Sequence, residues 1–120
     1  MTNTEHPSLP PPDVLTELSL QVLLATGDGP LHGYAIGKDI EARTLGRLDP
    51  TTGALYQALK RLTVDGLLRP VSPPSRGDVD ARRKHFAITP AGRKAVAAEI
   101  ERLDTIVALA RSRRLYPARA

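Results

Sequence analysis

The sequence has no cysteine and no tryptophan, and only one phenylalanine and three tyrosines among its 120 residues. Without cysteine there is no disulfide, thiolate metal ligand or cysteine nucleophile, which fits a reducing compartment, so we expect a cytoplasmic protein. With so few aromatic side chains, Leu, Ile, Val and Ala must fill the core of one small domain. No apolar run approaches the roughly 20 residues of a membrane span, and the proline-rich start cannot serve as the apolar core of a signal peptide.

Positive charge is concentrated in the middle of the chain. Residues 1–42 carry one basic and six acidic side chains, for a net charge of −5, whereas residues 43–94 carry eleven basic and four acidic ones, for +7. Residues 95–120 add +2. A basic centre indicates a polyanionic partner. A solvated surface that is merely rich in arginine accounts for the same counts, so charge alone leaves both interpretations open.

Proline and glycine positions divide the chain into a tail and a helical region. Four prolines in residues 1–13 predict a disordered tail. From Asp13 onward, leucines and valines at helical spacing predict a first helix with apolar side chains on two sides. Such a helix needs one partner within its domain and points to another in a second chain. A short second helix is expected from Gly33 to about Arg43.

The clearest helix start lies at Asp49-Pro50. Asp49 is a good N-cap acceptor and Pro50 suits the first helical position, which predicts a third helix over about residues 50–65. Asp65-Gly66 should end it. The buried stripe of this helix is expected to be Leu55, Leu59 and Leu62.

A hairpin and a long helix complete the predicted order. Short strands near Leu68 and Phe86 flank a polar turn that makes a plausible wing over about residues 72–84. A helix over 90–114 then follows, and residues 115–120 form a flexible tail. Apolar residues step along that helix by 4, 3, 4 and 3, a heptad-like seam that a second chain would cover. The expected dimer interface is Leu18, Val22, Val96, Ile100, Leu103, Val107 and Ala110.

This order predicts a mainly α fold with a two-stranded β-hairpin wing (α+β), in which a winged helix-turn-helix domain over 14–89 precedes a C-terminal dimerisation helix. In such folds the third helix enters the major groove of DNA and the wing meets the backbone or minor groove. Threonine hydroxyls, Gln57 and the basic side chains can contact phosphates or base edges. The candidate DNA-binding residues are Thr51, Thr52, Tyr56, Gln57, Lys60, Arg61, Arg76, Arg82, Arg83 and Lys84.

These assignments have structural alternatives. Thr51 and Thr52 can serve only to stabilise the helix start, and Lys60 and Arg61 can form a solvated face. For Tyr56 we favour packing, with its hydroxyl at the rim. The basic hairpin can likewise be a solvated tip of mixed charge.

Four motifs stand out along the chain: HGYAI at 32–36, TGALYQALKRL at 52–62, DGL at 65–67 and RRKHFAITPAG at 82–92. Together they resemble the PadR family of bacterial winged-helix transcriptional regulators. HGYAI at 32–36 is similar to the family's H-G-Y-x-I, and TGALYQALKRL at 52–62 resembles its G-x-L-Y-x-x-L-x-x-L core. DGL at 65–67 fits the D/E-G-L strand entry. RRKHFAITPAG at 82–92 is similar to R-R-K-x-Y-x-I-T-x-x-G. Each motif is common singly, but together they are specific.

The resemblance implies a sequence-specific regulator of transcription, expected to be a repressor, that binds double-stranded DNA as a homodimer through its C-terminal helix and the partner's first helix. Phe86 stands where the family usually has Tyr, and Asp49 where Ser often caps the recognition helix. Some members bind small-molecule effectors at the dimer interface through aromatic residues of the last helix. Beyond Phe86 this chain offers only Tyr116 there, so an effector remains an open alternative.

Catalysis is not expected. The candidates for a metal or a general base are His6, His32 and His85, which belong to separate segments without ligand spacing. We therefore predict no catalytic residue, metal or cofactor. The remaining alternative to a DNA-binding regulator is a winged-helix module that binds another protein and not DNA.

Overall fold

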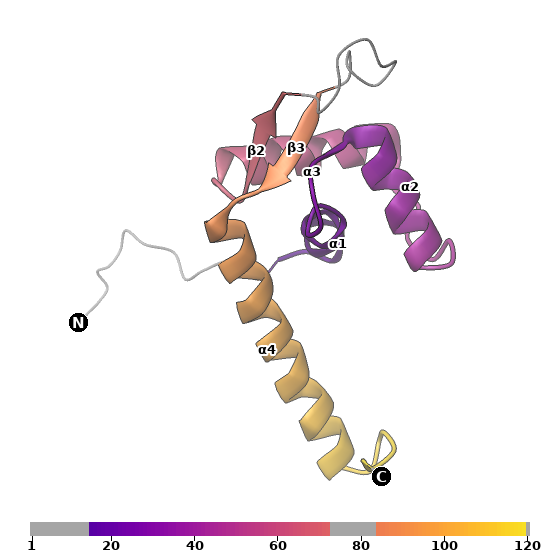
Figure 1. Cartoon of the computed structure of the whole chain (residues 1–120). Helices are drawn as coiled ribbons and strands as arrows, with labels where there is room; N and C mark the ends of the chain where they lie inside the picture. The colour runs from indigo at the N-terminus through magenta and orange to yellow at the C-terminus, as the bar shows by residue number, and fades with distance from the viewer. Residues whose placement is uncertain (1–14, 73–83, 120) are drawn as a thin grey trace, which may run out of the picture.

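The computed structural model describes residues 15–72 and 84–119. In these residues helices predominate over a small antiparallel sheet, and the predicted mainly α fold with a β wing is confirmed (Figure 1). The elements are α1 (Glu17–Ala25), β1 (Leu31–His32), α2 (Gly33–Arg43), α3 (Thr52–Val64), β2 (Leu68–Val71), β3 (His85–Ile88) and α4 (Pro90–Ser112).

The sheet has three strands in the order β1-β3-β2, one more than the sequence predicted. The additional strand is β1, in which Leu31 pairs with Phe86 and His32 pairs with His85. A strand of two residues shows no alternation of apolar and polar side chains, so the sequence pattern does not reveal it. Through β1, the start of α2 is joined to the end of β3 that lies next to the β2–β3 connection.

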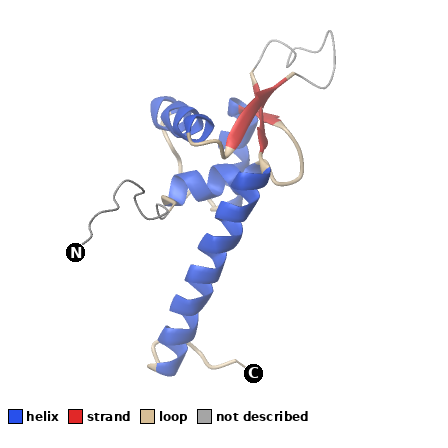
Figure 2. Cartoon of the chain, turned by 90° about the vertical axis from the view of Figure 1, so that its left-hand side faces the viewer, coloured by secondary structure: helices blue, strands red, loops and turns tan. Residues whose placement is uncertain are grey.

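The first three helices enclose the core together with the sheet. Each contributes the apolar side chains that helical spacing places on one face, and β2 and β3 close the remaining side. Figure 2 shows these elements grouped at one end of the molecule, with α4 extending away from them. The buried core residues are Val22, Leu23, Ile36, Ile40, Leu55, Leu59, Leu62, Leu68 and Phe86.

α3 begins later than Asp49-Pro50 indicated. Its N-cap is Thr51, whose Oγ1 accepts a hydrogen bond from the backbone N–H of Ala54 at 3.0 Å. Leu48 packs against the core, and the chain from there to Pro50 is non-helical. The capping role therefore falls to the threonine that follows the proline, and the prediction for Asp49 was wrong.

α4 starts at the predicted Thr89-Pro90 and is fixed there to the end of α3. The Thr89 hydroxyl accepts from the Gly92 N–H at 3.0 Å and donates to the carbonyl oxygen of Gly66 at 2.6 Å. A Cβ on residue 92 would lie only 2.3 Å from the carbonyl oxygen of Leu67, so this approach requires glycine. The start of α4 thus packs directly on the segment that follows α3.

Beyond its first turns, α4 leaves the body of the domain (Figure 1). After α4 ends at Ser112, residues 115–119 fold back onto the last turn of this helix. Arg111 Nε donates to the carbonyl oxygen of Pro117 at 3.0 Å, and the Arg111 guanidinium lies 5.0 Å from the Tyr116 ring centroid. None of the helices in the described ranges is long and apolar enough to cross a lipid bilayer.

Candidate nucleic-acid interface

The turn between α2 and α3 is held by one threonine and two left-handed residues. The Thr44 hydroxyl donates to the Ile40 carbonyl at 2.8 Å and accepts from the Leu48 N–H at 3.2 Å. Leu45 and Gly46 adopt φ values of 55° and 78°. These residues reverse the chain within a few positions, which lets α3 lie across α2 as in a helix-turn-helix.

α3 has one apolar side and one polar side. Its three buried leucines face the core, and the side chains between them face solvent. All candidate DNA-binding residues at the cap and along this helix are exposed, and they lie on the sides of the helix that the buried leucines leave free. These residues are Thr51, Thr52, Tyr56, Gln57, Lys60 and Arg61.

Two of these residues also serve the fold. Thr51 caps α3, which is the helix-stabilising role considered as an alternative from the sequence. Its hydroxyl hydrogen can still be donated to another group, such as a phosphate. Arg61 Nε lies 3.4 Å from Asp65 Oδ2 in an exposed i,i+4 pair, which holds the guanidinium only weakly. Lys60 and Gln57 lie between them on the exposed surface of the helix.

Tyr56 lies at the edge between α3 and α2. Its side chain is 50% exposed, and its hydroxyl oxygen reaches the buried first residue of α2, Gly33. This agrees with the packing role favoured from the sequence.

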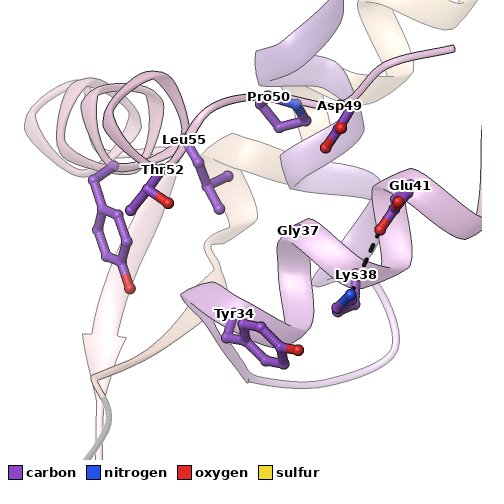
Figure 3. A pocket seen from close by; sticks show the side chains of 9 residues that line it. Tyr34, Gly37, Lys38, Glu41, Asp49, Pro50, Thr52 and Leu55 are labelled. Carbon is purple, nitrogen blue, oxygen red and sulfur yellow. Dashed lines mark ion pairs between the residues drawn. The ribbon is translucent and has the colours of Figure 1, made fainter. Parts of the chain in front are cut away.

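A pocket of about 230 Å³ opens between α2 and the start of α3 (Figure 3). α2 contributes Tyr34 and Lys38, whose Nζ lies 5.5 Å from the Tyr34 ring centroid and 3.7 Å from Glu41 Oε1. The side of α3 contributes Thr52, and Asp49 adds a carboxylate.

Tyr34 and Lys38 line this pocket but were not among the site residues predicted from the sequence. The available signal was Tyr34 itself, an aromatic residue in the HGYAI motif that is 58% exposed and contributes nothing to the core. Lys38 follows it by one helical turn, so a pair at i and i+4 could have been noticed.

On the hairpin, the structure describes only part of the predicted basic surface. Lys84 is exposed just before β3, and its Nζ lies 5.8 Å from the Phe86 ring centroid. The other candidates, Arg76, Arg82 and Arg83, lie outside the described residues, as does the 1–13 tail.

The expected dimer residues differ in accessibility. Val22 is 0% exposed and belongs to the core of its own chain, so it has no surface for a partner, and we remove it from the interface. Leu18 is half-buried against that core. On α4, Ile100 is 46% exposed. The other expected residues of the helix are partly buried: Val96, Leu103, Val107 and Ala110.

The two described histidines serve the fold. His32 caps α2 by accepting the Ala35 N–H on Nδ1 at 3.1 Å, and its ring centroid lies 5.3 Å from that of buried His85. Within residues 15–72 and 84–119, no three His, Cys, Asp or Glu side chains are grouped as metal ligands.

Comparison with solved structures supports the fold. A PadR family transcription regulator from Clostridium difficile R20291 superposes with a TM-score of 0.69 at 18% identity, covering 81% of this chain and 97% of that one. Bacillus subtilis PadR, solved in complex with operator DNA, gives 0.59 at 19% identity over 69% of this chain and 46% of that one.

Comparison of sequences identifies the family. An uncharacterized 37.1 kDa protein in transposon TN4556 of Streptomyces fradiae is 42% identical over 83 residues, which are 69% of this chain but 22% of the relative. The chain thus spans about a fifth of that relative's length. The sequence model of the "Transcriptional regulator PadR-like family" matches residues 22–98. The chain therefore belongs to the PadR-like family, whose members are transcriptional regulators and not enzymes.

Proposed function

We propose that this chain is a sequence-specific DNA-binding repressor that acts as a homodimer. α3 lies in the major groove, and the hairpin over about residues 72–84 follows the DNA backbone or minor groove. In this proposal residues 14–89 bind DNA and residues 90–114 hold the two copies together. Repression follows from occupancy, because a dimer on an operator excludes other proteins from the same DNA.

The observation that carries the proposal is the exposed polar side of α3. A helix whose one side is fixed by buried leucines and whose other side holds hydroxyl, amide and ammonium groups can place those groups in a groove as a rigid set. Gln57 has the bidentate amide that matches an adenine edge, and Lys60 has a cation for phosphate. The likeness of the fold to Bacillus subtilis PadR, solved with operator DNA, supports the same use.

The homodimer is supported by the exposed apolar surface of α4. Ile100 is 46% exposed, and the residues that helical spacing places on the same side of α4 are partly exposed: Val96, Leu103, Val107 and Ala110. A helix of 23 residues is about 35 Å long, which exceeds what the domain of this chain covers. Exposing such a row to water is unfavourable, at roughly 25 cal/mol per Å² of apolar surface, so a second copy would stabilise α4.

A small-molecule effector at the dimer interface, which the sequence left open, is a further part of this proposal. A pocket of about 170 Å³ lies between α1 and the start of α4, where Arg93 and Val96 contribute to its wall. This is smaller than the roughly 300 Å³ of a typical ligand site. We propose that a second copy completes it, because Val96 belongs to the expected interface.

The proposal is tested by letting the purified chain select duplexes from a random-sequence library. Binding of a selected duplex and of an unrelated duplex is then measured at 50 and 200 mM salt. For a dimer that neutralises about 6 to 10 phosphates, affinity should fall by about three to five decades over this range. The selected duplex should bind at least about 10³-fold more tightly than the unrelated one.

The other outcomes separate the alternatives. Equal binding to both duplexes would contradict sequence-specific recognition and leave only an electrostatic interaction. Absence of binding at 50 mM salt would contradict the proposal and favour the module that binds another protein. Sedimentation of the same sample reports whether the species that binds DNA is a dimer.

A further inference from the structure

Most glycines in the described part of the chain have a reason within the fold. Gly29, Gly46 and Gly66 have positive φ values, which side chains rarely adopt. At other glycines a Cβ would approach a neighbouring atom to between 2.3 and 3.3 Å. The glycines of this second group are Gly27, Gly33, Gly37 and Gly92.

Gly53 is the exception among the described glycines. Its φ is not positive, and a Cβ built on it would have no atom within 4 Å. It is exposed and lies in the first turn of α3. Within a helix, glycine is less favourable than alanine by up to about 1 kcal/mol, so the fold of this chain favours alanine at position 53. Nothing in the described part of the chain therefore requires glycine at position 53.

The position of Gly53 indicates which contact requires it. Gly53, Gln57 and Lys60 are spaced by four and then three residues, so they form one row along α3. This row points away from the buried leucines and contains the amide and the ammonium group assigned to DNA. Because Gly53 has no side chain, the backbone at the N-terminal end of this row can come closer to a molecule bound there.

We infer that Gly53 sets the distance at which α3 approaches DNA, because a side chain there would meet the groove before Gln57 could reach a base. The inference rests on the proposed function and deepens it, since it assigns a positioning role to a residue without a side chain. Gln57 has a short reach, and about 1 Å of additional separation breaks a direct hydrogen bond to a base edge.

The test compares Gly53→Ala and Gly53→Leu with Ala54→Leu as the matched control. Ala54 is exposed on the same turn but lies about 100° around the helix from residue 53. Thermal unfolding and affinity for the selected and the unrelated duplex are measured for each variant. For the selected duplex we expect losses of about tenfold for Gly53→Ala and about 100-fold for Gly53→Leu, on the scale of one to two lost base contacts.

The expected pattern differs from that of a structural defect. Gly53→Ala should unfold at the same or a higher temperature, because alanine favours the helix. Affinity for the unrelated duplex should change less than affinity for the selected one, since contacts to phosphates tolerate a small displacement better than contacts to bases. Ala54→Leu should retain affinity within about threefold on both duplexes.

If a folded Gly53→Leu variant binds the selected duplex with wild-type affinity, the inference about Gly53 is wrong, whereas the proposed function is not affected. An equal loss in Ala54→Leu would also overturn the inference, because the effect would then belong to the whole helix start and not to the row of Gly53. If the wild-type chain selects no duplex, the proposed function fails, and the inference fails with it.

Discussion

The hydroxyl oxygen of Tyr56 lies 2.8 Å from the point that a Cβ on residue 33 would occupy, and its Cζ lies 3.0 Å from the same point. Gly33 is the first residue of α2 and is buried, whereas Tyr56 lies on the second turn of α3. The absence of a side chain at Gly33 therefore lets the tyrosine of one helix rest on the backbone of the other. This contact joins the edges of the two helices of the helix-turn-helix.

Gly33→Ala should lower the free energy of unfolding by up to about 1 kcal/mol, because the half-exposed ring of Tyr56 must turn outward to admit the methyl group. In a Tyr56→Ala background that cost should largely disappear, since the obstructing ring is gone. Urea denaturation of the two single variants and the double variant gives the coupling energy. Strict additivity of the two changes would show that the contact does not constrain the helices.

Lys60→Ala should weaken binding to the selected and the unrelated duplex alike. Each phosphate contact contributes about one unit to the slope of log affinity against log salt, so the slope should decrease by about one per copy of the lysine. The side chain is exposed, and the unfolding temperature should not change. Lys94→Ala, on the first turns of α4, is the control with the same loss of charge. A salt slope equal to that of the wild type would remove Lys60 from the DNA surface.

Ile100→Asp should convert a dimer into a monomer that folds but loses its affinity for DNA. The side chain is 46% exposed in the single chain, so its replacement spares the core, whereas a carboxylate buried between two copies has no partner. Ala98→Asp places the same charge on an exposed position of α4 across the helix and should remain dimeric. Sedimentation velocity distinguishes the two results, and a dimeric Ile100→Asp would place the interface elsewhere.

The Glu99–Arg102 pair predicts a specific response to acid. Arg102 donates to both carboxylate oxygens of buried Glu99, at 3.1 and 2.5 Å, and these hydrogen bonds hold the pKa of Glu99 below its usual range although burial acts in the opposite direction. A lowered pKa in the folded state means that the ionised pair stabilises the protein at neutral pH. That contribution is lost as the pH falls through the lowered pKa.

Arg102→Gln should therefore raise the pKa of Glu99 and reduce the loss of stability between neutral and acidic pH. Carboxyl-carbon NMR titration of Glu99 measures the first effect, and urea denaturation at several pH values measures the second. Arg102→Lys keeps a cation without the bidentate geometry and should give an intermediate result. An unchanged titration midpoint in Arg102→Gln would show that the pair does not control the carboxyl group.

The sequence was informative wherever one local pattern determined the outcome. The leucines of α3 recur at helical spacing and are all buried, and Thr89-Pro90 begins α4 as predicted, with the Thr89 hydroxyl capping the helix and proline in its first turn. The polar residues of α3 could be found in the same way, since they occupy the positions that the leucines leave free.

Features that depend on the surroundings were not accessible from the sequence. Asp49 and Thr51 have nearly equal capping chemistry, and local pattern alone does not show that the helix starts at Thr51, after the non-helical stretch in which Leu48 packs against the core. Val22 shares a helical stripe with Leu18, but the spacing does not show whether a residue faces its own core or another chain. β1 forms only because β3 offers it a partner.

The hydroxyl of Thr89, the N-cap of α4, donates a hydrogen bond to the carbonyl oxygen of Gly66. Because Gly92 has no side chain, the same turn of α4 can approach the backbone of Leu67 closely. The start of α4 and the segment that follows α3 are therefore in direct contact, so we expect the two helices to move together. In the proposed dimer, a rotation of one α4 against the other would swing the two α3 helices apart or together by the same angle. The spacing of the two operator half-sites is then set by how two long helices cross, at a distance from any base.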